Sequence, residues 1–140
     1  MKFTYTLLPP LAGHGRWQGM PFVEVTLYGK TSQRTVLALV DSGAMCCLVN
    51  ARYAEKLGID LPKNERVEFY GVAGTENRIG APMATITLQV KGLEPVEVSA
   101  GFIDSDAVGI ILGQDGFFDQ HRIKFEKDHK MFEITSIKKK

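Results

Sequence analysis

The stretch LALVDSGA, residues 37–44, is an apolar run that stops abruptly at an acidic residue and a glycine. Four apolar residues, 37–40, are typical of a buried strand. Asp41-Ser42-Gly43 alone indicates a turn, because Asp and Ser side chains bond nearby backbone and Gly tolerates positive φ. In this context the strand delivers the Asp41 carboxylate to the end of a sheet, on the rigid backbone that a catalytic group requires.

Short apolar segments recur along the rest of the chain, separated by turns that contain glycine. Asn50 predicts the N-cap of a short helix over 51–57 that ends at Gly58, and we expect a second short helical piece after Gly113. Many short strands with one or two brief helices favour an all-β domain, closed or sandwich-like. The expected strands cover residues 22–28, 34–40, 66–70, 79–90, 95–103, 109–112, 123–125 and 130–134.

The bulk properties of the chain exclude several classes of protein. Its 140 residues suffice for one domain with a hydrophobic core. A net charge of +1 gives no electrostatic case for nucleic acid or for a membrane surface as partner. We expect residues 1–20 to form an irregular arm, residues 21–136 to form the folded domain, and residues 137–140 to form a basic tail.

The compartment is predicted from three features. No apolar run approaches the length of a transmembrane helix, and the N-terminal stretch does not resemble a signal peptide. Cys46 and Cys47 are adjacent, so they are poor partners for one another and provide no disulfide framework. Together these features favour a cytoplasmic protein.

Three motifs in the expected order resemble the retropepsin-like aspartic proteases, in their bacterial or cellular branch. Residues 40–44, VDSGA, are similar to the active-site signature of this family, and residues 109–113, GIILG, to its second signature. Residues 70–75, YGVAGT, resemble its flap, and the expected helix lies where many members carry one. The resemblance implies an all-β acid-protease half-barrel with one or two short helices, a flap hairpin and the Asp-Ser-Gly loop, forming a two-fold symmetric dimer.

The chemistry of this family explains why a dimer is needed. Aspartic proteases activate water between two carboxylates that share one proton, because like charges held so close do not both ionise. This chain has one Asp-Ser-Gly and no internal repeat, so one copy cannot supply the pair. We therefore expect a homodimeric aspartic endopeptidase in which Asp41 meets its symmetry mate.

The resemblance also assigns roles to individual residues. Asp41 is the expected catalytic acid, the Ser42 hydroxyl would bridge to the partner's loop, and Gly43 would let backbone approach the carboxylates. An extended peptide or protein substrate would bind as an added strand. No cofactor and no metal is implied. The residues expected to contact substrate are Ala44, Tyr70, Gly71, Val72, Ala73, Gly74 and Ile111.

The chain departs from the retroviral members at two positions. Met45 and Gln114 stand where those members commonly carry an acidic residue and an arginine, so that ion pair is missing. Dimer architecture therefore cannot simply be transferred from the viral enzymes. Ser42 replaces a frequent threonine and keeps the hydroxyl.

Several residues of the chain allow other chemistry or other functions. His14, His121 and His129 lack metal-ligand spacing, which favours positions at the surface. A Cys46 or Cys47 nucleophile is disfavoured by apolar surroundings. Asp115 is an alternative second acid in the same chain, although a helix N-terminal role is favoured.

One alternative function is a non-proteolytic peptide-binding or dimerisation module. Another is a domain that works only in a larger complex, with its N-terminal arm as a docking or self-processed segment.

Overall fold

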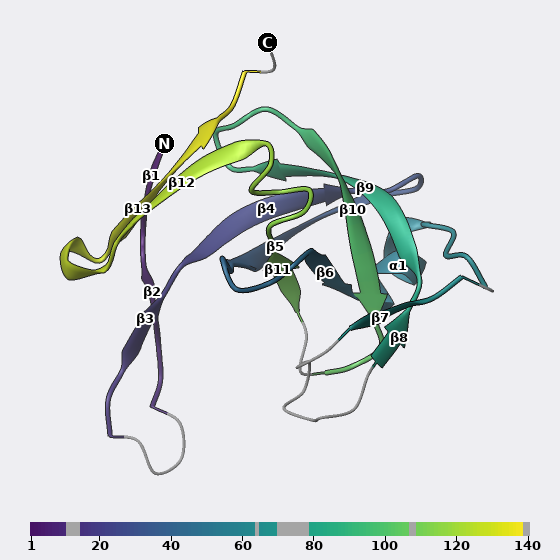
Figure 1. Ribbon diagram of the computed structural model, residues 1–140, viewed down its shortest axis with the longest axis horizontal. Coiled ribbons are helices and arrows are strands. Elements are labelled where there is room, and N and C mark those ends of the chain that lie inside the picture. Colours follow the sequence, from purple (N-terminus) through teal and green to yellow (C-terminus); the bar gives the residue numbers. More distant parts are fainter. Residues whose placement is uncertain (11–14, 64, 70–78, 107–108, 139–140) are drawn as a thin grey trace.

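A six-stranded barrel forms the centre of the protein (Figure 1). The computed structural model describes residues 1–10, 15–63, 65–69, 79–106 and 109–138. The strands close in the order β10-β6-β11-β5-β4-β9, which confirms the expected all-β fold. Their bounds are β4 (Phe22–Tyr28), β5 (Gln33–Val40), β6 (Cys47–Asn50), β9 (Met83–Val90), β10 (Val96–Ile103) and β11 (Ile110–Leu112).

The barrel core follows from the alternation of apolar residues along its strands. In β4, Val23, Val25 and Leu27 point inward and are almost fully buried, whereas the residues between them are more exposed. Leu88 and Val90 of β9 complete the same cluster from the neighbouring strand. Each such side chain contributes about 1.5–3 kcal/mol on burial.

Strand β11 lies between two strands that are distant from it in sequence. It pairs parallel with β5, where Leu112 lies opposite Val40, and antiparallel with β6, where Ile110 lies opposite Val49. Because β5 and β11 run in the same direction, Asp41 and Gly113 leave the barrel at the same end. The fold therefore brings the two predicted signatures together.

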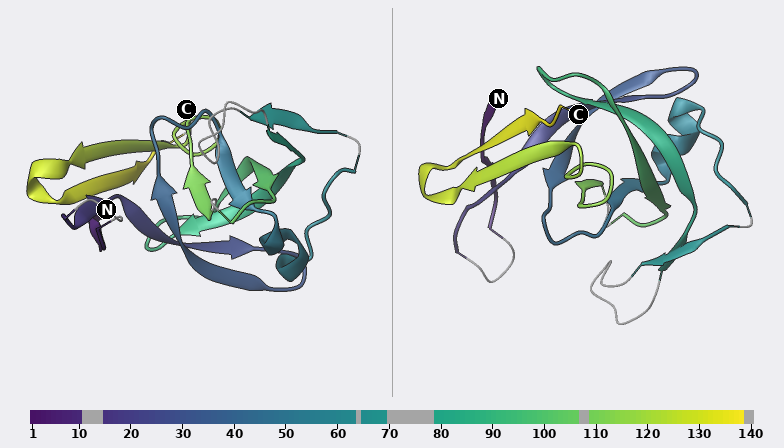
Figure 2. Two further views of the ribbon diagram at one scale, coloured as in Figure 1. Left: turned by 90° about the horizontal axis from the view of Figure 1, so that it is seen from below. Right: turned by 45° about the horizontal axis from the view of Figure 1, so that its top comes forward.

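The described part of the first twenty residues contains three short strands and is not the irregular arm that the sequence predicted. Strand β1 (Lys2–Thr4) pairs with β13 (Met131–Ser136), which pairs in turn with β12 (His121–Glu126). Strands β2 (Thr6–Leu8) and β3 (Gln18–Met20) form a hairpin that projects from the barrel (Figure 2). Prolines and glycines hide this pattern locally, and the partner that orders β1 lies at the other end of the chain.

The one α-helix among the described residues, α1 (Arg52–Leu57), begins one residue later than expected. Ala51 occupies the N-cap position, while Asn50 is buried at the end of β6 and accepts a hydrogen bond from the Arg52 N–H at 3.0 Å. Gly58 ends the helix as predicted, with a φ of 68° that favours glycine. No helix in the described parts of the chain is long and apolar enough to span a bilayer.

Three further predictions of secondary structure were incomplete or wrong. The strand expected over 79–90 is divided into β8 (Ile79–Ala81) and β9 by Pro82, which has no N–H for a ladder. The sequence did not predict β6, which pairs parallel with β10. The segment after Gly113 forms consecutive turns instead of a helix, since Gly116 adopts a φ of 96°.

His121 is buried, with 2% of its surface exposed, and not at the surface as expected. Its Nδ1–H donates to the carbonyl of Phe117 at 2.9 Å, and its ring stacks on the Phe117 ring at 4.3 Å. Its Nε2 has no hydrogen-bond partner in the part of the chain that the structure describes. Burial lowers the pKa of His121, because the imidazolium would lose its hydration there.

This burial predicts a loss of stability in acid. Below about pH 6.5 the unfolded chain binds a proton at His121 that the folded chain disfavours, so the free energy of unfolding decreases as the pH falls. His121→Asn, whose amide can still donate to the Phe117 carbonyl, should lose less. Urea unfolding of both proteins at about pH 7 and about pH 5 measures the difference. An equal loss in the two proteins would show that His121 does not contribute.

Candidate active site

Asp41 is fixed by backbone on the end of the barrel. Its N–H donates to the carbonyl of Leu112 at 3.0 Å, which continues the ladder between β5 and β11 by one bond. Its side chain is half-buried. The carboxylate is thus carried by two paired strands and not by a free loop.

Residues 41–44 form a tight turn around the carboxylate. The Ala44 N–H donates to the Asp41 carbonyl at 3.2 Å, and the Gly43 N–H donates to Asp41 Oδ1 at 2.9 Å. Asp at the first position of a turn typically accepts such a bond from the residue two places on. The bond orients the carboxylate from within its own turn.

Residues that follow β11 bind this turn along its whole length. The backbone N–H groups of Gln114 and Asp115 donate to the carbonyls of Ala44 and Met45 at 2.9 and 2.8 Å. The Gln114 side chain donates from Nε2 to the Ser42 carbonyl at 2.7 Å. Sequence reasoning treated Gln114 only as a missing arginine, and its amide donor was the signal that could have revealed this contact.

Gly113 allows the Asp41 turn and the segment after β11 to approach one another so closely. It is buried, and a Cβ at this position would collide with the carbonyl groups of Cys46 and Ala44. Its N–H points to Cys47 Sγ at 3.5 Å. The glycine of the second signature is therefore required by backbone-to-backbone contact beside the Asp41 turn.

Neither thiol is activated for nucleophilic attack. Burial raises the pKa of Cys47 to about 11, and burial followed by the charge of Asp115 raises the pKa of Cys46. Both thiols are protonated at neutral pH, and the thiolate is the nucleophilic form. Cys46 is only partly buried, whereas Cys47 is 1% exposed. Within the described residues no group of three His, Cys, Asp or Glu could hold a metal ion.

The structure describes some of the predicted substrate-binding residues and not others. Ala44 is half-buried in the Asp41 turn, and Ile111 packs against the small cluster of Leu48, Ala81 and Ile103. Ala81 ends β8, which pairs with β7 (Val67–Phe69). The predicted flap residues Tyr70, Gly71, Val72, Ala73 and Gly74 lie outside the described residues, between these two strands.

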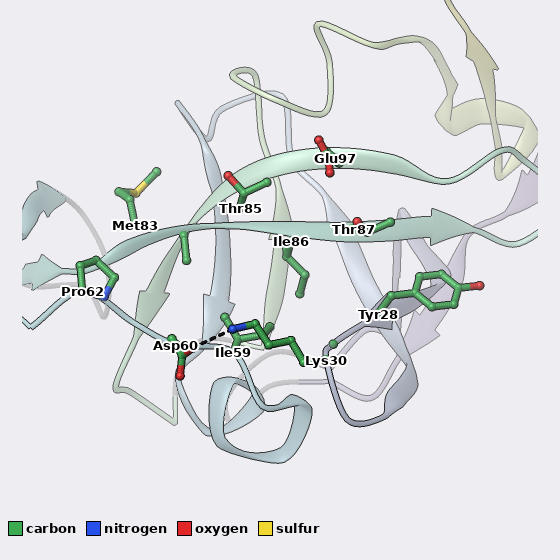
Figure 3. Close-up of a pocket in the computed structure, with 12 residues that line it drawn as sticks. Tyr28, Lys30, Ile59, Asp60, Pro62, Met83, Thr85, Ile86, Thr87 and Glu97 are labelled. Carbon is green, nitrogen blue, oxygen red and sulfur yellow. Dashed lines mark hydrogen bonds and ion pairs between the residues drawn. The ribbon is translucent and has the colours of Figure 1, made fainter.

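A separate pocket of about 450 Å³ lies on the flank of the barrel, and none of the predicted site residues lines it (Figure 3). Thr85 and Thr87 of β9 form part of its wall. Lys30 and Asp60 form an ion pair across it at 2.7 Å, and both side chains are largely exposed. Three charged residues line this pocket, Lys30, Asp60 and Glu97, and the first two satisfy one another.

The geometry of the Asp41 turn agrees with the comparison of the whole sequence with protein families. A family model described as aspartyl protease matches residues 23–115, from β4 to the segment that binds the turn. The chain belongs to the aspartyl protease family. No curated protein sequence matches this aspartyl protease family member.

Solved structures place the fold within the same group. A retropepsin-like aspartic protease from Rickettsia conorii is similar over 95% of this chain and 99% of its own, with 14% identity and a TM-score of 0.52. The retroviral protease-like domain of Ddi1 from Leishmania major is similar over 84% of this chain and 90% of its own, with 25% identity and a TM-score of 0.55. The fold of this family member is thus retropepsin-like.

The close approach at Gly113 predicts a position that tolerates no side chain. Gly113→Ala should lower the free energy of unfolding by about 1–3 kcal/mol, because the turn must move away from the added methyl group. Gly109→Ala is the matched control, since a Cβ there meets open space. Urea unfolding measures both variants, and equal stability of the two would contradict the requirement for glycine.

Proposed function

We propose that this chain is an aspartic endopeptidase that works as a homodimer, with Asp41 of each protomer forming one active site. The observation that carries the proposal is the fixed Asp41 carboxylate at the end of a closed barrel, held by its own turn and by the segment after β11. Membership of the aspartyl protease family supports the same reaction class.

Two carboxylates at one site supply both an acid and a base. One Asp41 is ionised and takes a proton from water, whose oxygen attacks the carbonyl carbon of the peptide. The other Asp41 is protonated and polarises the carbonyl oxygen. The tetrahedral intermediate then collapses: the first Asp41 passes the proton that it took from water to the amide nitrogen, and the C–N bond breaks.

The count of catalytic loops supports the homodimer. The sequence has a single Asp-Ser-Gly, so the second carboxylate must come from a second copy related by a two-fold axis. Ser42 is exposed on the turn, where its hydroxyl can reach the partner's loop. Gly43 presents only backbone beside Asp41, which leaves room for the partner and the substrate.

The substrate is an extended peptide or protein segment that binds as an added strand between the Asp41 turn and a flap of residues 70–74. Two observations support this arrangement. Phe69 and Ile79 pair across β7 and β8, so the ends of the flap segment are neighbours. Ile111 belongs to the apolar cluster that includes Ala81 of β8, on the flap-bearing side.

Substitution of the proposed catalytic acid tests the enzyme. Asp41→Asn should lower cleavage of a peptide library by about 10⁴-fold or more at every pH, because the amide neither takes up a proton nor ionises. Asp115→Asn is the control for a second acid in the same chain and should retain cleavage. Peptide products are measured by mass spectrometry from about pH 3 to about pH 8.

Two results would contradict the proposal. Wild-type protein that is dimeric and cleaves nothing at any pH would favour the peptide-binding or dimerisation module instead. Loss of cleavage in Asp115→Asn as complete as in Asp41→Asn would favour a dyad within one chain and remove the need for a partner.

A further inference from the structure

A single peptide group beside the proposed catalytic acid is held by hydrogen bonds at both of its ends. The N–H of the Ser42–Gly43 peptide belongs to Gly43 and donates to Asp41 Oδ1 at 2.9 Å. The carbonyl of the same peptide belongs to Ser42 and accepts from Gln114 Nε2 at 2.7 Å. Because a trans peptide is planar, fixing the direction of its carbonyl also fixes the direction of its N–H.

The turn itself leaves this peptide two orientations. Ser42 and Gly43 are the two central residues of the turn that the bond from Ala44 N–H to Asp41 carbonyl closes. Gly43 does not have a positive φ, as in a type I turn. Rotation of the central peptide gives a type II turn, which requires a positive φ at the second central residue and favours glycine there. The glycine therefore makes the flipped turn accessible at little steric cost.

A flipped peptide would damage the site. Its N–H would turn away from Asp41 Oδ1, and the carboxylate would lose the hydrogen bond that orients it. The carbonyl dipole would also face the opposite way. A donor on the Ser42 carbonyl opposes this rotation, and Gln114 provides one on a backbone already bound to Ala44 at 2.9 Å.

We propose that Gln114 is a positioning residue that locks the Ser42–Gly43 peptide with the Gly43 N–H directed at the Asp41 carboxylate. The inference rests on the proposed function of Asp41. A hydrogen bond to the carbonyl of a peptide also polarises its N–H and makes that N–H a better donor.

The chemistry of glutamine suits this task beside a shared-proton dyad. An amide donates without adding a net charge. A cation at the same place would favour ionisation of both carboxylates and oppose their shared proton.

Removal of the donor tests the lock. Gln114→Met keeps a side chain of similar length and removes the N–H, so kcat for a peptide that wild type cleaves should fall about tenfold with KM changed less than about twofold. The acid limb of the pH–rate profile should move to higher pH, since the ionised carboxylate loses its oriented donor.

Two companion variants separate the lock from general loosening of the turn. Gln120→Met removes an amide from the same series of turns that donates to Glu97 and Gly116 carbonyls, and it should keep the kcat and the acid limb of wild type. Gln114→Glu should be as slow as Gln114→Met at neutral pH. Its activity relative to wild type should rise below about pH 4.3, where the protonated carboxyl regains a donor.

The outcomes distinguish this inference from the function on which it rests. If Asp41→Asn is inactive but Gln114→Met matches wild type in kcat and pH profile, the enzyme stands and the lock is refuted. Equal losses of kcat in Gln114→Met and Gln120→Met would also refute it, because they would reflect loosening of the turns. If wild type cleaves no peptide, the proposed function fails and the lock fails with it.

Discussion

The contact between the end of β11 and the Asp41 turn is the constraint on which the site depends. Gly113 permits it by having no side chain, and backbone bonds from Asp41, Gln114 and Asp115 maintain it. The barrel positions this contact by pairing β11 with β5 on one side and β6 on the other. A flexible loop could present the same Asp-Ser-Gly, but it would not hold a carboxylate in one orientation.

Local pattern was sufficient to predict an all-β domain, closed or sandwich-like, and the resemblance carried by the signatures implied the half-barrel. Strands β4 and β5 form where the sequence has apolar runs of residues that favour strands. Gly58 ends α1 as predicted, because it adopts the left-handed conformation that stops a helix. Features that depend on distant partners were missed. Pairing of β1 with β13 and the bond from Gln114 to Ser42 join residues that lie far apart in the sequence.

In the proposed enzyme, a small domain of this kind must assemble because its site is incomplete. One protomer presents one carboxylate, fixed but without the second group that general acid–base hydrolysis needs. In the proposed homodimer, a two-fold axis would supply that group and place identical turns against each other. Each barrel would then have to hold its own turn rigidly, because the two copies of Asp41 in the proposed homodimer must meet within the same small volume.

Subunit mixing measures the sharing of one site most directly. Wild type and Asp41→Asn are unfolded, mixed in varying proportions and refolded together, and peptide cleavage is followed at constant total protein. If each site needs an aspartate from both copies, activity falls with the square of the wild-type fraction, to about one quarter at equal proportions. A fall in direct proportion, to about one half at equal proportions, would mean that each chain works alone and would contradict the shared dyad.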